Sequence, residues 1–323
     1  MTVPSQQSHP EPRRPLVDGE FPLTYRDFKR IAEILRTDIG IVMVEAKAPL
    51  VYSRLVKRLR HLGLKNFQDY CLLITSSNGK IERREMLAAL TTNVTSFFRE
   101  NHHFDHLKND VLPALLDKAR RGERVRIWSA GCSSGMEPYS IALTILALAS
   151  DAAELDIRVL ATDIDPAMLR DGAVGNYGET AMKPVSRDMK ARWFFRGAPE
   201  KGEQMWRVGD ELRKLVAFRE LNLMQKPWPM RGPFQAIFCR NVLMYFDGPT
   251  QADVLNRFVP LTAPGGHLYI GHSERLNNEA KQWFDTVQFT VHRRKPAMRH
   301  FERPAIIAQT SKEPVRPATE GQT

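Results

Sequence analysis

The first third of the chain places apolar residues at helical spacing. Phe28, Ile31 and Leu35 share one face of a helix that Thr24 can cap and Gly40 can end. Three further helical patterns follow, built on Val51, Leu55, Leu59 and Leu62 before Gly63, on Phe67, Tyr70, Cys71 and Ile74 after Asn66, and on Met86, Leu87 and Leu90. The pattern predicts an all-helical domain over residues 21–92.

The pattern changes after about residue 101, where short apolar runs typical of strands alternate with helical stretches. A helix with Pro113 as a kink comes first. The strand candidates are Val125–Ser129, Arg158–Thr162, Val216–Glu220, Ala236–Arg240, His267–Gly271 and Phe289–Arg293. This alternation predicts an α/β domain over residues 93–295, with a mostly parallel sheet and helices on both faces. A less regular insert at about 173–213 is expected to be a loop or a β-hairpin.

Composition limits the class of protein. The 323 residues are 42% hydrophobic and 26% charged, as in ordinary folded chains. The ends, 1–20 and 296–323, are rich in Pro, Gln, Ser and Thr and lack periodicity, so we expect disordered tails. The longest apolar run, about 141–149, is too short to span a bilayer, and residues 1–17 lack the apolar segment of a signal peptide, so we expect neither membrane spanning nor secretion. Three cysteines without CxxC or zinc spacing indicate a reducing cytoplasm and no metal site.

The charge of the chain is strongly positive. There are 47 Lys and Arg against 37 Asp and Glu, a net charge of +10, with an isoelectric point near 9.6. Half of this excess lies between residues 20 and 92, which hold 13 basic and 8 acidic residues. An acidic partner is therefore expected, and nucleic acid, an anionic membrane or an acidic protein surface all remain open.

A glycine-rich turn follows the first predicted strand. Gly131 and Gly135 in Ser129-Ala-Gly-Cys-Ser-Ser-Gly-Met-Glu-Pro-Tyr-Ser140 allow a sharp turn and a close approach to a ligand, although a plain strand-to-helix turn has the same glycines. The spacing is G-x-x-x-G instead of G-x-G-x-x-G, and Glu137 would repel a pyrophosphate. The turn thus disfavours NAD and FAD and suits S-adenosylmethionine, a cationic nucleoside without phosphate.

Polar residues also follow the later strands. Asp163 ends the second strand, where an acidic residue can bind both ribose hydroxyls, while Asp165 before a proline is better suited to capping a helix. Arg240 and Asn241 follow Ala236-Ile-Phe-Cys239 and are expected to face the same crevice, with a structural ion pair as the alternative for the arginine. Asn222 follows another strand and could contact adenine or simply form a turn.

The segment between the two predicted domains, Asn93-Val-Thr-Ser-Phe-Phe-Arg-Glu100, is unusually aromatic for a linker and indicates a packed lid. Together with the glycine-rich turn, Ala161-Thr-Asp-Ile-Asp165, Asn222-Leu223 and Cys239-Arg-Asn-Val-Leu-Met-Tyr-Phe246, it resembles the CheR family of chemotaxis receptor methyltransferases. The match runs from about Tyr25 to Arg293. The resemblance implies a Rossmann-like methyltransferase domain preceded by an all-helical domain.

The resemblance further implies a reaction and a site. A methyl group would pass from S-adenosylmethionine to glutamate side chains of methyl-accepting chemotaxis receptors, leaving S-adenosylhomocysteine and requiring no metal. Arg99 and Tyr245 would lie nearest the transferred methyl group. The expected cofactor-binding residues are Asn93, Thr95, Arg99, Glu137, Asp163, Asn222, Leu223, Arg240 and Asn241.

The same resemblance assigns the partner surfaces. The helical domain would face the helical bundle of the receptor through Arg54, Lys57 and Arg58, although a merely solvated helix face has the same pattern. The insert matches in position a small β-subdomain that in some relatives binds a peptide at the receptor's C-terminal end. Its loop reads Gly197-Ala-Pro, with the next glycine only at Gly202, so the peptide contact stays open. We expect a monomer that meets the membrane only through the receptor.

Two rival functions are weighed against this one. A nucleic-acid methyltransferase would fit the basic charge, but the chain has no Pro-Pro pair for base-nitrogen chemistry and no Pro-Cys nucleophile for cytosine chemistry. A non-catalytic protein that only senses the cofactor would share the fold. The presence of every motif residue favours the enzyme.

Overall fold

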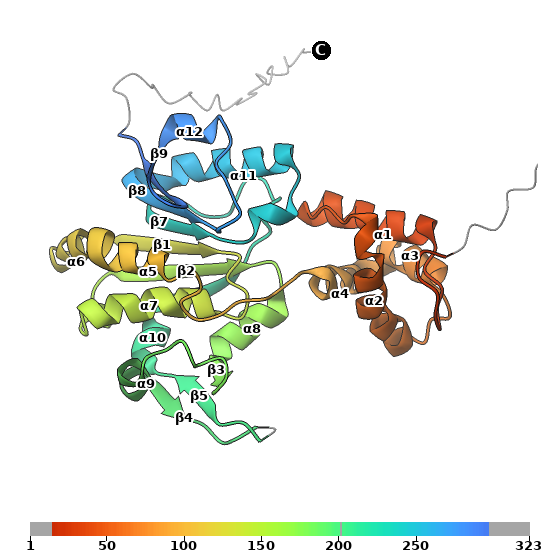
Figure 1. Ribbon diagram of the computed structural model, residues 1–323, viewed down its shortest axis with the longest axis horizontal. Coiled ribbons are helices and arrows are strands. Elements are labelled where there is room, and N and C mark those ends of the chain that lie inside the picture. The colour runs from red at the N-terminus through yellow and green to blue at the C-terminus, as the bar shows by residue number, and fades with distance from the viewer. Residues whose placement is uncertain (1–14, 201, 297–323) are drawn as a thin grey trace, which may run out of the picture.

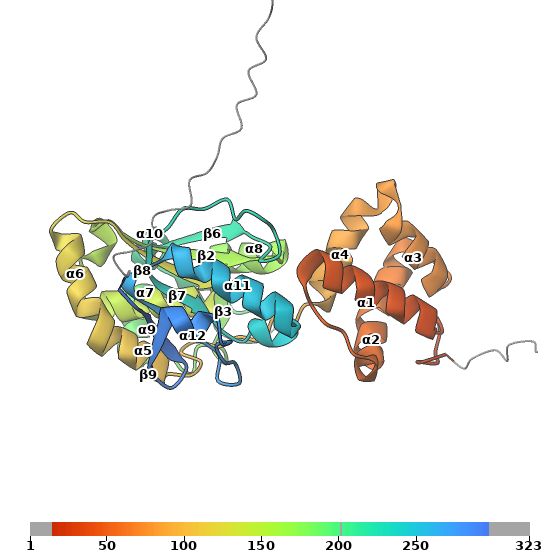
Figure 2. The same cartoon turned by 90° about the horizontal axis from the view of Figure 1, so that it is seen from above.

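The computed structural model describes residues 15–200 and 202–296, and its N-terminal helices form a lobe beside the rest of the molecule (Figures 1 and 2). The apolar faces of these helices meet in a core of their own that includes Ile31, Leu55 and Met86. The helices are α1 (Tyr25–Ile39), α2 (Ala48–Leu62), α3 (Phe67–Thr75) and α4 (Lys80–Leu90). All four predicted helices are thus confirmed.

Helix α1 begins and ends at the predicted signals. The Thr24 hydroxyl accepts a hydrogen bond from the backbone N–H of Asp27 at 3.2 Å, and the Asp27 carboxylate accepts from Thr24 in return, which completes a capping box. Gly40 ends the helix with a left-handed φ of 74°. The turn after it carries the chain toward the second lobe.

The tails predicted to be disordered lie mostly outside the described residues, but the prediction is wrong for residues 15–20. Residues 15–20 were expected to be disordered, and instead Leu16 and Val17 donate backbone hydrogen bonds to Leu23. Their side chains pack against the helical core. Two apolar residues next to a pairing partner are enough to order this short segment.

The second lobe is built on a seven-stranded sheet of order β6-β2-β1-β7-β8-β10-β9, in which β10 alone runs against the other strands. The predicted, mostly parallel α/β architecture is therefore confirmed. The strands are β1 (Val125–Ala130), β2 (Ile157–Asp163), β6 (Val216–Glu220), β7 (Phe234–Cys239), β8 (Thr262–Ile270), β9 (Phe284–Gln288) and β10 (Val291–Arg294).

Helices cover both faces of this sheet, as Figure 1 shows. Alternate strand residues point to opposite sides, so Ile127 joins the core on one face while Trp128 joins the core on the other. The helices of this lobe are α5 (His102–His106), α6 (Leu112–Arg120), α7 (Met136–Leu148), α8 (Pro166–Val174), α9 (Arg187–Trp193), α10 (Asp210–Leu215), α11 (Gly248–Leu261) and α12 (Ala280–Trp283).

Two features of this lobe escaped the sequence pattern. Strand β9 was not predicted because four of its five residues are exposed at the edge of the sheet, which leaves no apolar alternation to detect. The expected kink at Pro113 is a π-helical segment, Leu107–Val111, that joins α5 to α6. A proline cannot donate to the preceding turn, so the helix changes its hydrogen-bond register there.

The insert forms a small antiparallel sheet of order β3-β5-β4, made of β3 (Asn176–Gly178), β4 (Phe194–Arg196) and β5 (Met205–Val208). The hairpin alternative was therefore correct. Phe97 of the aromatic segment is buried against it, with its ring 5.0 Å from that of Tyr177 in an edge-to-face contact. The segment expected to be a packed lid thus packs on the insert.

In the described part of the chain, no helix has the length and apolar character needed to cross a membrane.

Candidate active site

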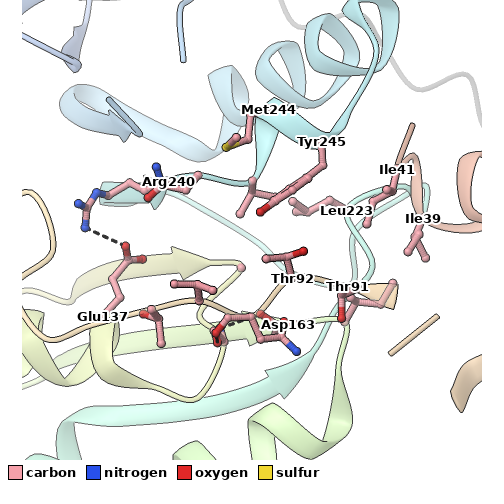
Figure 3. Close-up of a pocket in the computed structure, with 18 of the residues that line it drawn as sticks. Ile39, Ile41, Thr91, Thr92, Glu137, Asp163, Leu223, Arg240, Met244 and Tyr245 are labelled. Carbon is pink, nitrogen blue, oxygen red and sulfur yellow. Dashed lines mark hydrogen bonds and ion pairs between the residues drawn. The ribbon is translucent and has the colours of Figure 1, made fainter. Parts of the chain in front are cut away.

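A cavity opens at the carboxyl ends of β1, β2, β6 and β7 and faces the helical lobe (Figure 3). In open α/β sheets, ligands bind at this edge where the strand order reverses, and here the order reverses between β1 and β7. All of the residues predicted to contact the cofactor or the methyl group line this one cavity: Asn93, Thr95, Arg99, Glu137, Asp163, Asn222, Leu223, Arg240, Asn241 and Tyr245.

The glycine-rich turn forms one wall. Gly131 and Gly135 have φ values of 80° and 89°, a region that other residues rarely adopt. A Cβ atom on Gly131 would lie 2.4 Å from Val242 Cγ2, so only glycine fits between the two loops. The turn delivers Glu137 from the first turn of α7 into the cavity.

Glu137 belongs to a buried charge cluster. Its Oε1 accepts from Ser129 Oγ at 2.7 Å and its Oε2 lies 3.1 Å from Arg240 Nη1, the ion pair drawn in Figure 3. The other guanidinium nitrogen, Arg240 Nη2, lies 3.1 Å from Glu100 Oε2. The ion-pair alternative for Arg240 is therefore correct, and the arginine both pairs with carboxylates and lines the cavity.

The two carboxylates of this cluster differ in their pKa values. Burial raises the pKa of Glu137, and the Arg240 charge opposes that shift. Burial also acts to raise the pKa of Glu100, but the Arg240 charge and a hydrogen bond from the His272 backbone outweigh it, so this pKa is lowered. Glu100 is hence fully ionised at neutral pH.

Asp163 and Asp165 divide the two predicted roles. Asp163 accepts from the backbone N–H groups of Ser133 and Asp165, at 2.7 and 3.0 Å, one on each carboxylate oxygen. Each oxygen keeps a second lone pair, which suits a pair of ribose hydroxyls. Asp165 caps α8 by accepting from the Ala167 N–H, as predicted, and also accepts from Asn93 Nδ2 at 2.9 Å.

A buried carboxylate that the sequence analysis missed holds the loop after β7. Glu274 accepts from the backbone N–H groups of Asn241, Met244 and Gly271 at 3.0, 3.1 and 2.5 Å. Burial raises the pKa of Glu274 despite these bonds. It follows β8 closely, so the signal that found Asp163, an acidic residue just after a strand, could have found it too.

The helical lobe closes another side of the cavity. Ile39, Ile41 and Thr91 contribute to its lining, at the right of Figure 3. Asn222 Nδ2 donates to the carbonyl oxygen of Asp38 at 2.6 Å, so its amide links the cavity wall to the end of α1. This bond uses one of the two N–H groups of the amide, so one donor is left for a contact with adenine.

Tyr245 and Arg99 both line the cavity. Figure 3 shows the Tyr245 ring entering the cavity with its hydroxyl group foremost. Its carbonyl oxygen accepts from the Val42 N–H at 2.8 Å, a bond that ties the loop after β7 to the helical lobe. Arg99 Nη1 donates to the Val94 carbonyl oxygen at 3.0 Å.

The three basic residues predicted to face a receptor have different surroundings. Lys57 is exposed. Arg54 donates to the carbonyl oxygens of Ala89 and Thr91, and Arg58 makes a two-point hydrogen bond with the buried Glu82. These two arginines tie α2 to α4, so Lys57 is the one of the three with a charge directed to solvent.

The donors and acceptors of the cavity fit S-adenosylmethionine. Asp163 offers acceptors for a ribose, and each oxygen of Glu137 has one partner and keeps a lone pair that can accept from an ammonium group. Among its lining residues, none is a lysine, and both arginines, Arg99 and Arg240, already donate to protein oxygens. A pyrophosphate would find little free positive charge here.

Known protein families match this chain over both lobes. A model described as the CheR methyltransferase, all-alpha domain, matches residues 26–91. A second model, the CheR methyltransferase, SAM binding domain, matches residues 93–293. The two matches follow one another in the order of the two lobes.

Whole proteins are similar over the same region. A probable chemotaxis protein methyltransferase from Rhizobium etli is 52% identical over 80% of this chain and 96% of its own length. The chemotaxis protein methyltransferase of Salmonella typhimurium is 44% identical over 79% of this chain and 86% of its own. The chemotaxis protein methyltransferase of Escherichia coli K12 is 44% identical over 78% of this chain and 85% of its own length.

Proposed function

This chain belongs to the CheR methyltransferase family, and on that premise we propose that it methylates glutamate side chains of methyl-accepting chemotaxis receptors. It is an S-adenosylmethionine-dependent methyltransferase of chemotaxis. One observation carries the proposal for the site: the predicted cofactor residues, from the segment after the helical lobe and from several strand ends, line a single cavity.

The bound cofactor supplies a methyl group on a positively charged sulfur. In our proposal Asp163 binds the ribose, Glu137 the ammonium group, and the backbone around Asn222 and Leu223 the adenine. Arg240 pairs with Glu137 and opposes the rise in pKa that burial causes. The same residues would hold the product, S-adenosylhomocysteine.

No general base is needed for the transfer. A glutamate carboxylate with a reference pKa near 4.3 is ionised at neutral pH and is already a nucleophile. The rate comes from holding the carboxylate in line with the methyl group and from excluding water. We assign the first task to Arg99, which orients the incoming carboxylate or the cofactor, and the shaping of the methyl pocket to Tyr245.

The receptor is proposed to approach from the side of the helical lobe. Lys57 is exposed there and could attract an acidic helical bundle, while Arg54 and Arg58 act mainly by fixing α2. The target glutamates lie in the cytoplasmic part of such receptors, so we place this enzyme in the cytoplasm.

A second contact, with a peptide at the receptor's C-terminal end, is assigned to the insert. Strand β4 lies at an edge of the small sheet as far as the described residues show, and Phe195 on it is 59% exposed. An extended peptide could add to such an edge. Competition by a synthetic receptor C-terminal peptide in the methylation assay tests this contact.

The main proposal is tested with methyl-labelled S-adenosylmethionine and membranes that contain chemoreceptors. We expect the label to join receptor bands and to leave as methanol on mild alkali, which identifies a carboxyl methyl ester. Cofactor binding without label on any of several receptors would favour the non-catalytic alternative. Label on added RNA or DNA would instead revive the nucleic-acid methyltransferase.

A further inference from the structure

Glu100 lies behind the wall of the cavity and contacts two residues that line it. Its Oε1 accepts from Asn241 Nδ2 at 3.2 Å and from the backbone N–H of His272 at 3.2 Å. Its Oε2 lies 3.1 Å from Arg240 Nη2. One carboxylate thus holds the arginine and the asparagine at the end of β7 in a fixed orientation.

The backbone at Glu100 is held in an unusual conformation. Its φ is 57°, in the left-handed region that residues with a side chain seldom adopt, and Phe98 nearby has a φ of 52°. Strain of this kind persists where the surroundings impose it, often at functional sites. Here it brings the side chain of Glu100 and the carbonyl oxygen of Arg99 to the same guanidinium group of Arg240.

The charge of Glu100 is only partly compensated, because the single arginine Arg240 pairs with both Glu100 and Glu137. The charged residues that line the cavity balance one another, since Arg99 and Arg240 are opposed by Glu137 and Asp163. His103 Nδ1 lies 3.7 Å from Glu100 Oε2, but burial and the nearby Arg240 charge lower the pKa of His103 to about 2, so this ring is neutral. Glu100 therefore adds a net negative charge to the surroundings of the cavity.

We propose that Glu100, acting through Arg240, shifts the relative affinity of the cavity toward its cationic cofactor and away from the neutral product. S-adenosylmethionine carries one more positive charge than S-adenosylhomocysteine, because the sulfonium becomes a thioether when the methyl group leaves. A buried negative charge stabilises the first more than the second. The inference rests on the proposed use of this cofactor.

The test compares the binding of both molecules by calorimetry in the wild type and in Glu100→Gln. The amide oxygen of glutamine can still accept from Asn241 and His272, while its NH2 group replaces the charged oxygen that faces Arg240, so the charge and one acceptor are removed together. We expect the ratio of affinities, S-adenosylmethionine over S-adenosylhomocysteine, to fall about tenfold. Glu100→Asp, which keeps the charge, should retain the wild-type ratio even if both affinities drop.

Glu85→Gln is the matched control. Glu85 also pairs with an arginine, with its Oε2 3.5 Å from Arg58 Nη1, but it lies in the helical lobe and is 55% exposed. The ratio of the two affinities in Glu85→Gln should equal that of the wild type.

An unchanged ratio in folded Glu100→Gln, or an equal fall in Glu100→Asp, would overturn the proposal. If Glu100→Gln does not fold, Glu100→Asp decides: a wild-type ratio of affinities supports the proposal, and a tenfold fall overturns it. Failure of the wild type to bind S-adenosylmethionine would instead count against the proposed function.

Discussion

The carboxylates at this site have different surroundings, and their pKa values differ as a result. Glu137 and Asp163 share a cavity, and burial raises the pKa of both. Glu100 is ionised because Arg240 and several hydrogen bonds act against its burial. The cavity therefore contains two carboxylates that take up a proton at a higher pH than usual, and the carboxylate behind its wall stays ionised to a lower pH than usual.

The raised pKa of Glu137 predicts a pH-dependent affinity for the cofactor. An acid with a raised pKa takes up its proton at a higher pH than an ordinary glutamate, and the protonated form cannot attract an ammonium group. Binding of S-adenosylmethionine should thus weaken as the pH falls through this pKa. Calorimetry across pH in the wild type and in Glu137→Gln should show weaker binding and a flatter profile in the variant.

Some pH dependence should remain in that variant, because burial also raises the pKa values of Asp163 and Glu274. A profile as steep as that of the wild type would contradict the assignment to Glu137.

Arg99 is expected to matter for the transfer step itself. Arg99→Ala should lower turnover about 100-fold, the cost of a misplaced reacting group. Steady-state kinetics with receptor membranes, together with cofactor binding by calorimetry, measures both effects. Arg187→Ala, at an exposed position on α9, is the control and should behave as the wild type. Near-normal turnover with normal cofactor affinity in Arg99→Ala would remove this residue from the mechanism.

At the scale of elements, the ends of helices and strands were the most predictable parts. Thr24 and Gly40 mark the two ends of α1, Gly63 ends α2, and Asp165 caps α8. Each does so through hydrogen bonds to residues a few positions away. Such contacts depend on local sequence, so the pattern alone reveals them. Strand β9 shows the opposite case, since its pairing with β10 at the sheet edge leaves no local signature.

The loop after β7 should depend on Glu274. In Glu274→Gln the side chain has a single oxygen, so at least one of the three backbone N–H donors loses its acceptor. We expect the free energy of unfolding to fall by roughly 1–3 kcal/mol, the cost of a buried unsatisfied donor. Urea denaturation measures this loss.

Cofactor affinity should weaken in the same variant, because Asn241 and Tyr245 lie on this loop. Glu123→Gln, at an exposed ion pair on the surface, should change stability by less than about 0.5 kcal/mol. Equal stabilities of the two variants would show that the loop is held by other contacts.

At the scale of the molecule, two lobes share one cavity. The lobes are joined by the pairing of Ile41 with Phe246, by the bond from Asn222 to Asp38, and by exposed ion pairs such as Arg84 with Glu220. Neither lobe alone has the complete cavity wall. That the helical lobe, residues 21–92, is an independent domain stays a prediction, as does the boundary at 93–295 for the second domain.

The distribution of charge over the lobes predicts a salt-sensitive encounter with the receptor. Lys57→Glu should lower kcat/KM for the receptor about tenfold at low ionic strength, because a steering charge is reversed. The difference should shrink near 0.5 M salt, where screening extends only a few ångströms. The affinity for S-adenosylmethionine should stay the same.

Lys118→Glu is the matched control, since Lys118 lies on α6 at the opposite end of the molecule in Figure 1. An equal loss in both variants would mean that total charge matters and that this face of α2 does not.

The sequence by itself determined the fold class, the order of the two lobes and the edge of the sheet where the site lies. Parallel strands bring their carboxyl ends to one edge, so polar residues after separate strands, such as Glu137, Asp163 and Arg240, had to gather. The motifs further identified the family, because they occur together and in order.

Only the tertiary structure decided which of these residues bind one another. Asn222 is hydrogen-bonded to Asp38, which lies 184 positions away in the sequence, and Asn241 to Glu100, which lies 141 positions away. Such pairs form when packing brings distant segments within hydrogen-bond distance, and no local pattern records that distance. The ion pair of Glu100 with Arg240, the burial of Glu274, and the use of Arg58 within the helical lobe could be known only from the folded chain.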